Sequence, residues 1–179
     1  WSSGNNAAFL GGGSVQGTFT KQNATNPLNG TYSYTFVQAS GSLNDYLASD
    51  VISVPIRARG NTNCVDVVYT YDGADSDIKW VVYDVTNSTI LSSTSAVVAY
   101  STIAKSQQII FDMPANCTQI RFGFQVLVAN NGKTLKFDDT QLGTWTYQVA
   151  NTVEQESIDL LSHAGFGSIA TKIPYFSTV

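Results

Sequence analysis

Short stretches in which apolar and polar residues alternate recur along most of this 179-residue chain. Residues 31–37 (Thr-Tyr-Ser-Tyr-Thr-Phe-Val) show the pattern most clearly, with aromatic and hydroxyl side chains at alternating positions. A period of two places neighbouring side chains on opposite faces of an extended backbone, which is typical of a strand buried on one side. Similar runs cover residues 51–58, 65–71, 78–85, 90–100, 107–113, 119–128, 135–142 and 145–149, and a shorter one covers 14–20.

Turn-forming residues separate these runs, at 59–63, 72–75, 85–88, 114–116 and 130–133. Eight or nine short strands with no helix between them predict an all-β fold, an antiparallel β-sandwich. The strand count favours a jelly roll over an immunoglobulin domain, because Cys64 and Cys117 lack the Cys-Trp-Cys spacing of that domain.

We expect one such domain between two segments of different texture. Residues 1–13, which include Gly-Gly-Gly, are predicted to be an irregular N-terminal approach, and residues 14–149 are predicted to form the jelly roll. Residues 150–179 are predicted to connect the sandwich to a following domain or partner subunit, with a short helix at 153–164. The chain begins with Trp rather than Met, so we expect a piece of a longer protein.

The second unusual feature is the scarcity of charge. Lys, Arg, Asp and Glu make up 12% of the chain, against roughly a quarter in an average globular protein. Ser and Thr contribute 38 residues instead, while a hydrophobic content of 43% indicates a packed core rather than a disordered segment. A net charge of −4 argues against nucleic-acid binding, and no apolar run approaches the ~18 residues of a membrane helix.

The chain lacks the residues that most metal sites and nucleophilic active sites require. His163 is the one histidine, so neither a His-based triad nor a His-rich zinc site can be assembled. Cys64 and Cys117 are expected to be buried free thiols if the protein matures in a reducing cytoplasm; a disulfide would need their Cβ atoms about 4 Å apart. No nucleophile–base pair or acid/base carboxylate pair stands out, so we expect no enzymatic activity.

Sugar recognition is one chemistry to consider, because aromatic rings stack on sugars and planar amide or guanidinium groups bind hydroxyls; a plain solvated sheet face is the alternative. On 119–127, alternate apolar residues predict a core-facing set, which leaves Arg121, Gly123 and Gln125 on a polar outer face. Trp80 and Asp84, on one face of 78–85, are the other candidate ligand residues. The competing interpretation places Trp80 in the core and makes Asp84 a turn-capping residue.

Two acidic groups are candidates for a metal ion. Asp138 and Asp139 are neighbours on a predicted strand, so their side chains point to opposite faces and cannot act together as an acid/base pair. One of them could ligate a calcium ion at the edge of the sandwich. Asp72, Asp75 and Asp77 resemble a calcium loop only loosely and are better explained by a hairpin turn.

A family resemblance rests on the order of several loose motifs. These are Gly-Thr-Tyr-Ser-Tyr-Thr-Phe (30–36), Ile-Ser-Val-Pro (52–55), Val-Val-Tyr-Asp-Val-Thr-Asn (81–87), Gln-Ile-Arg-Phe-Gly-Phe-Gln-Val (119–126) and Phe-Asp-Asp-Thr-Gln-Leu (137–142). In this order they resemble the galactose-binding-like jelly rolls of carbohydrate-binding modules, particularly the copies in bacteriophage tail fibres and tailspikes. The resemblance covers roughly residues 14–143.

The resemblance implies a non-catalytic virion structural module on the particle surface, which attaches to host glycans or keeps the fold for assembly alone. It implies a structural calcium ion at Asp138 and Asp139, and neighbouring virion subunits as partners in a homo-oligomer, with a trimer favoured. Affinity would then be multiplied by symmetric copies. An ancillary module of a polysaccharide-degrading enzyme is the alternative.

Overall fold

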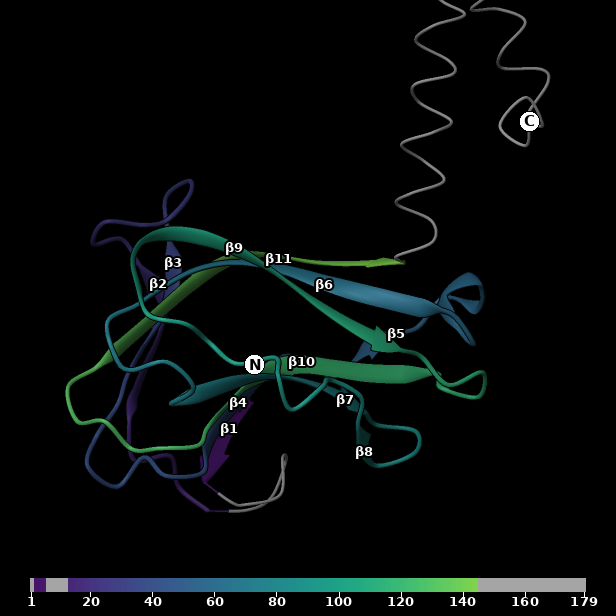
Figure 1. The fold of residues 1–179 in the computed structure, drawn as a ribbon, viewed down its shortest axis with the longest axis horizontal. Helices are drawn as coiled ribbons and strands as arrows, with labels where there is room; N and C mark the ends of the chain where they lie inside the picture. Colours follow the sequence, from purple (N-terminus) through teal and green to yellow (C-terminus); the bar gives the residue numbers. More distant parts are fainter. Residues whose placement is uncertain (1, 6–12, 145–179) are drawn as a thin grey trace, which may run out of the picture.

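A computed structural model of the chain describes the backbone of residues 2–5 and 13–144, and the side chains of these residues up to Asp138. Two antiparallel sheets pack face to face, as Figure 1 shows in side view. The predicted all-β sandwich is confirmed. Among the described residues no helix is long and apolar enough to span a lipid bilayer.

The six-stranded sheet has β10 at its centre. Its order is β1 (Ser2–Asn5), β4 (Asp45–Ala48), β10 (Gln119–Val126), β7 (Ile78–Asp84) and β8 (Thr89–Ile90), and β5 (Ile52–Ser53) pairs with β10 next to β4. The order of the five-stranded sheet is β2 (Thr18–Asn23), β3 (Ser33–Val37), β11 (Thr134–Thr144), β6 (Thr62–Tyr71) and β9 (Ser101–Asp112). The chain crosses repeatedly between the sheets, as expected of a jelly roll.

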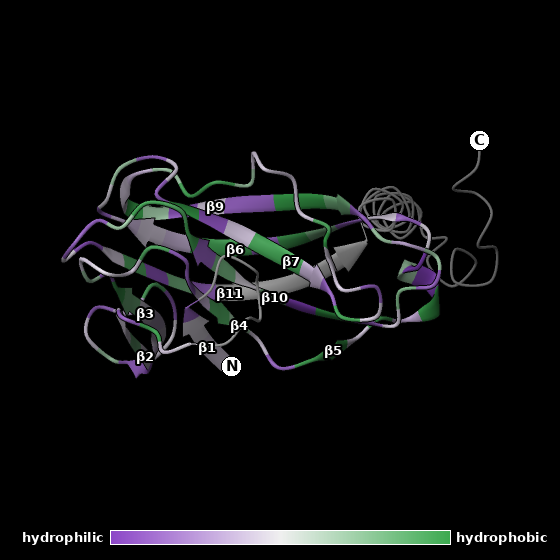
Figure 2. Ribbon diagram, turned by 90° about the horizontal axis from the view of Figure 1, so that it is seen from below, coloured by the Kyte–Doolittle hydropathy of each residue, from purple (hydrophilic) through white to green (hydrophobic). Residues whose placement is uncertain are grey.

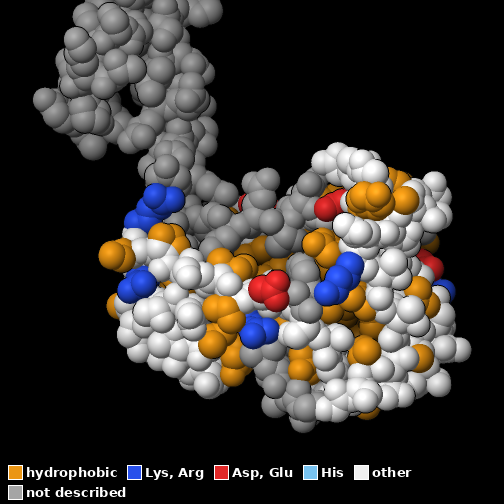
Figure 3. All heavy atoms as spheres, turned by 180° about the vertical axis from the view of Figure 1, so that it is seen from behind, with side chains coloured by type: hydrophobic (Ala, Val, Ile, Leu, Met, Phe, Trp, Pro, Cys, Tyr) orange, Lys and Arg blue, Asp and Glu red, His pale blue; other side chains and the backbone are white. Residues whose placement is uncertain are grey.

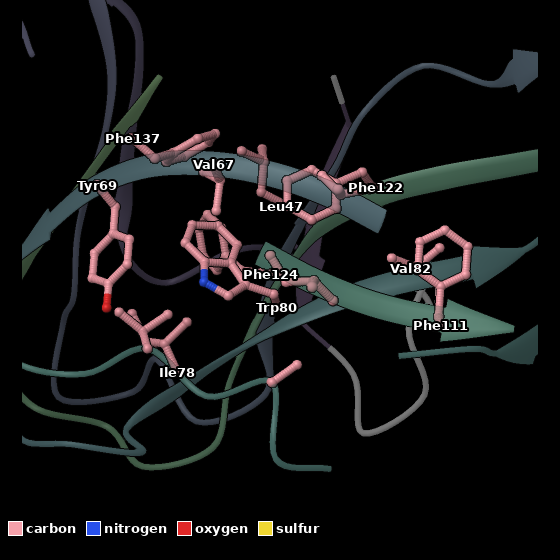
Figure 4. Close-up of a cluster of buried hydrophobic side chains, with 14 of the residues drawn as sticks. Leu47, Val67, Tyr69, Ile78, Trp80, Val82, Phe111, Phe122, Phe124 and Phe137 are labelled. Atoms are coloured by element: carbon pink, nitrogen blue, oxygen red, sulfur yellow. The ribbon is translucent and has the colours of Figure 1, made fainter. Parts of the chain in front are cut away.

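The core lies where the inward positions of both sheets meet, and its centre is aromatic (Figure 4). The Trp80 indole stacks on Phe122, with ring centroids 5.6 Å apart, and meets the edges of Tyr69 and Phe137. Hydrophobic and hydrophilic residues are interspersed along several strands of both sheets in Figure 2, as expected where one face of a strand packs in the core.

Several predicted elements need correction. Residues 2–5, expected to be irregular, form β1, and β4 was not predicted at all; both are four-residue strands with few large apolar side chains, so no alternation marks them. The run at 51–58 splits into β5 and a 3₁₀ helix (Ile56–Ala58), because Pro55 lacks an N–H for the sheet. The strand predicted at 90–100 does not form: β8 ends at Ile90, β9 begins at Ser101, and between them Val97 makes an isolated β-bridge to Lys79. The predicted strand at 145–149 and connector helix at 153–164 lie outside the described residues.

Candidate functional site

The outer face of the six-stranded sheet, turned away from the core, brings together side chains from β4, β7 and β10. Their register makes rows across the strands: Gln125 lies between Tyr46 and Lys79, Gly123 lies between Ala48 and Val81, and Arg121 lies beside Tyr83. The small side chains of the middle row are therefore flanked by longer ones on both sides.

This outer face is partly apolar. Tyr46, Ala48 and Val81 form a second buried cluster, separate from the sandwich core, and Tyr83 packs against it. One reason is that the Tyr46 side chain lies against Gly4 of β1, where an added Cβ atom would come within 2.9 Å of two ring carbons and the hydroxyl oxygen of Tyr46. The accessible part of the face is therefore the side of β7 and β10 that carries Tyr83, Lys79 and Arg121, all partly exposed.

Arg121 is held where the backbone leaves the sheet between β4 and β5. Its Nη1 donates to the Ser2 hydroxyl at 3.0 Å and to the Ser49 carbonyl at 3.3 Å. Its Nε is buried and has no hydrogen-bond partner.

The predicted pair Arg121 and Gln125 does share this outer face. Gln125 is only 3% exposed, so of the two only Arg121 reaches the surface. Their role in binding stays a prediction.

Trp80 is not part of this face, and its predicted role as a ligand contact is wrong for a physical reason. The side chain is 0% exposed at the centre of the core, and its Nε1 donates to Gln107 Oε1 at 3.0 Å. Ile78, Trp80 and Val82 alternate as apolar residues, and this alternation marks the inward face of β7.

The prediction that Asp84 contacts a ligand is also wrong, since this side chain is 0% exposed and caps a turn. Its carboxylate accepts the backbone N–H of Asn87 at 3.0 Å and the Asn87 side-chain amide at 2.6 Å. Burial opposes ionisation of Asp84, but these hydrogen bonds outweigh it and lower the pKa of the carboxyl.

Gly123 brings strands together rather than admitting a ligand. A Cβ atom at this position would overlap the backbone carbonyl oxygen of Leu47 on β4. The missing side chain therefore allows β4 and β10 to approach, which is one of the uses of glycine inside a strand.

Tyr83 and Lys79 are candidate ligand residues that the sequence interpretation passed over in favour of the opposite face of the same strand. The signal that would have found them is the apolar alternation of β7, which assigns its odd-numbered positions to the outside.

The acidic positions that suggested metal sites have structural partners. Asp138 accepts a hydrogen bond from the Ser33 hydroxyl at 3.2 Å, and the Asp139 side chain lies outside the described residues. Asp77 belongs to a turn and accepts Ala74 N–H and the Tyr71 hydroxyl, but the predicted hairpin is wrong, because this turn joins β6 and β7, which belong to different sheets. In the described part of the chain, no three Asp, Glu, His or Cys side chains gather as a metal site. The calcium ion stays a prediction.

The outer face of the five-stranded sheet is different in kind. Its outward positions in the described strands carry hydroxyl, amide, aliphatic and charged side chains and no aromatic ring. Cys64 lies on this sheet and Cys117 lies in the core; both side chains are buried, and the two do not form a disulfide.

Solved structures of the same fold share little sequence with this chain. It matches a family 4 carbohydrate-binding module with a TM-score of 0.53 and 11% identity, over 73% of this chain and 79% of the module. The chain has the jelly-roll fold of carbohydrate-binding modules. No protein-family model matches it, and no curated protein does.

The same fold also occurs inside larger proteins. An arabinose-bound α-L-arabinofuranosidase matches with a TM-score of 0.54 and 13% identity, over 72% of this chain and 22% of that one. The enzymatically active domain of tailspike protein 4 of Bacteriophage CBA120 matches with a TM-score of 0.52 and 9% identity, over 80% of this chain and 19% of that one. The chain thus spans about a fifth of either protein.

Proposed function

We propose that this chain is a non-catalytic module that binds polysaccharide on the outer face of its six-stranded sheet. The observation that carries the proposal is the alignment of Tyr83, Arg121 and Lys79 on adjacent strands, beside the apolar cluster around Val81. An aromatic ring, a guanidinium and an ammonium group on one rigid sheet match the apolar faces and hydroxyls of a sugar chain.

The carboxylates support a binding role over a catalytic one. Buried Asp45, Asp77 and Asp84 each accept hydrogen bonds from backbone N–H groups and hold loops or turns in place. Carboxylates committed in this way stabilise the fold and are poorly placed to exchange protons with a substrate.

We further propose that the module serves a bacteriophage fibre or tailspike, displayed on the virion surface in a homo-oligomer that attaches to host glycans. The fold's occurrence in a phage tailspike supports this setting. Its occurrence in an arabinofuranosidase supports the alternative, an ancillary module of a polysaccharide-degrading enzyme, equally well. The two settings differ in ligand: surface polysaccharide of a bacterial host in the first, the polysaccharide that the enzyme degrades in the second.

Affinity electrophoresis of the full chain tests the proposal, in gels that contain bacterial capsular or plant cell-wall polysaccharides. Several copies on one scaffold raise a weak affinity to a measurable one. We expect Tyr83→Ala to weaken binding roughly tenfold, as the loss of an aromatic contact of about 1.5 kcal/mol predicts.

Tyr32→Ala is the matched control, because this tyrosine is 49% exposed and lies directly before β3 of the five-stranded sheet. Its binding should equal that of the unmodified chain. Equal losses in both variants would place the site elsewhere, and no retardation in any gel under multivalent display would refute a binding role.

A further inference from the structure

We infer that the polysaccharide is acidic and that its carboxylates are bound by Arg121 and Lys79; this rests on the function proposed above. Arg121 and Lys79 are the only charged residues at the outward positions of the six strands of this sheet, and both are cationic. The chain as a whole carries a net charge of −4, so this face is opposite in sign to the molecule.

The acidic residues of the same strands do not offset these cations on the outer face. Asp45 and Asp84 occupy inward positions at strand ends, are 0% exposed and are bonded to nearby N–H groups. Asp50, between β4 and β5, is the exposed carboxylate whose charge interacts with that of Arg121. A neutral ligand would leave two cations facing one carboxylate, while an anionic ligand balances the charge.

Arg121 is oriented for a carboxylate. Ser2 and Ser49 fix the guanidinium through Nη1, which leaves the edge formed by Nε and Nη2. Nε on this edge is a buried donor without an acceptor, and a buried N–H in that state costs free energy. Because Nε is out of reach of solvent, a ligand carboxylate would meet the guanidinium at Nη2, which also carries part of its delocalised positive charge.

The spacing of the cations indicates a polymer rather than a single sugar. Lys79 lies opposite Gln125, which is four residues along β10 from Arg121. At about 3.3 Å per residue, this separates the two positions by ~13 Å along the strands. A chain with carboxylates at intervals can reach both cations across the Val81 row, whereas one acidic monosaccharide contacts only one of them.

Pairs of polysaccharides that differ only in charge test the inference. Polygalacturonic acid, alginate, glucuronoxylan and bacterial capsular polysaccharides that contain uronic acid are each compared with their carboxyl-reduced forms, with the full chain in multivalent display. We expect the acidic member to bind at least about tenfold more tightly than its reduced form wherever binding occurs, as one charge-assisted contact predicts. Binding should weaken as NaCl is raised from low to physiological concentration and above.

Single substitutions distinguish the contributions of Arg121 and Lys79 to binding. Arg121→Gln should weaken binding to the acidic member about tenfold, and Lys79→Gln should weaken it about threefold, as expected for a flexible ammonium group that makes a weaker ion pair. Arg121→Lys should keep the salt dependence but recover only part of the affinity, because it lacks the planar edge. Lys105→Gln, on exposed β9 of the other sheet, makes the same charge change and should have no effect.

The outcomes are distinguishable. If reduced and acidic forms bind equally well, or if Lys105→Gln weakens binding as much as Arg121→Gln, the preference for acidic ligands is wrong while polysaccharide binding stands. If neither form of any pair binds, the proposed function itself fails.

Discussion

At Trp80 the indole ring lies between the two sheets, and its one polar atom donates to Gln107. We expect Trp80→Phe to lower the free energy of unfolding by about 1–3 kcal/mol, from lost packing and an unpaired Gln107 oxygen. Urea denaturation measures this loss. Polysaccharide affinity of the folded variant should be unchanged, and a weakened affinity at full stability would return Trp80 to the ligand site.

Ionisation of the Cys117 thiol makes the free energy of unfolding depend on alkaline pH. Burial, with the Asp84 carboxylate as a further cause, raises the pKa of this thiol from 9.0 to about 11. As pH rises, the thiol therefore loses its proton at a lower pH in the unfolded chain than in the folded one. The contribution of the Cys117 thiol to the free energy of unfolding is present below pH 9 and is lost as pH rises towards 11.

The test is the difference in unfolding free energy between the unmodified chain and Cys117→Ala, measured at intervals from pH 8 to pH 11. We expect this difference to shrink with rising pH, because the variant lacks the thiol and the tyrosines titrate in both proteins. A difference that stays constant would show that the thiol does not contribute.

Between β4 and β10 the spacing of two elements depends on one missing side chain. Gly123→Ala would place a methyl group on the Leu47 carbonyl oxygen, which belongs to the backbone and cannot rotate away. We expect a loss of about 3 kcal/mol or more, the upper part of the range for overpacking. Thermal unfolding measures it, with Gly132→Ala as a control: that glycine has open space but a φ of +76°, so only modest strain of about 1 kcal/mol is expected.

Asp45 joins three segments that are distant in sequence. Its carboxylate accepts the Asn5 side-chain amide at 2.7 Å, the Gln16 backbone N–H and, at 2.7 Å, the Gly17 backbone N–H. Asp45→Asn replaces one acceptor oxygen with an NH₂ group that faces these donors, so we expect a loss of about 2–3 kcal/mol. Hydrogen exchange should show faster exchange at Gly17 than in the unmodified chain; unchanged protection there would contradict this role.

On the scale of the whole molecule, a buried polar network fixes the loops at one end of the sandwich. Gln38 donates to the Tyr71 hydroxyl, which donates to Asp77, and Asn130 donates to the same carboxylate. Tyr71→Phe removes the central hydroxyl, and we expect it to cost about 1–3 kcal/mol in urea denaturation. Asp77 lies two residues from Lys79, whereas Arg121 and Tyr83 lie at the other end of the site, so we expect affinity to fall by no more than about threefold, the loss expected for Lys79→Gln. A larger loss of affinity would couple the loops to Arg121 and Tyr83.

The scarcity of charge is visible on the surface, where Figure 3 shows Lys, Arg and Asp side chains as isolated spots among polar and apolar atoms. Two cations on one face therefore contribute more to the local electrostatic potential than they would on a protein surface with an ordinary density of charges.

The sequence alone determined which residues could form strands and, for 119–126, which side of the strand would face the core. Alternation at 31–37, 65–71 and 119–126 is a local pattern, and burial of one face of a strand produces it directly. For Arg121 and Gln125 the same pattern assigned the outer face correctly.

Only the tertiary structure decided which strands are neighbours, and with that which side chains meet. β4 and β10 lie more than 70 residues apart, and β4 is too short to show a period of its own. The candidate site depends on their pairing and on that of β7 with β10, because Tyr83 and Lys79 approach Arg121 only through this register. Strand pairing is set by long-range contacts that a local pattern does not contain.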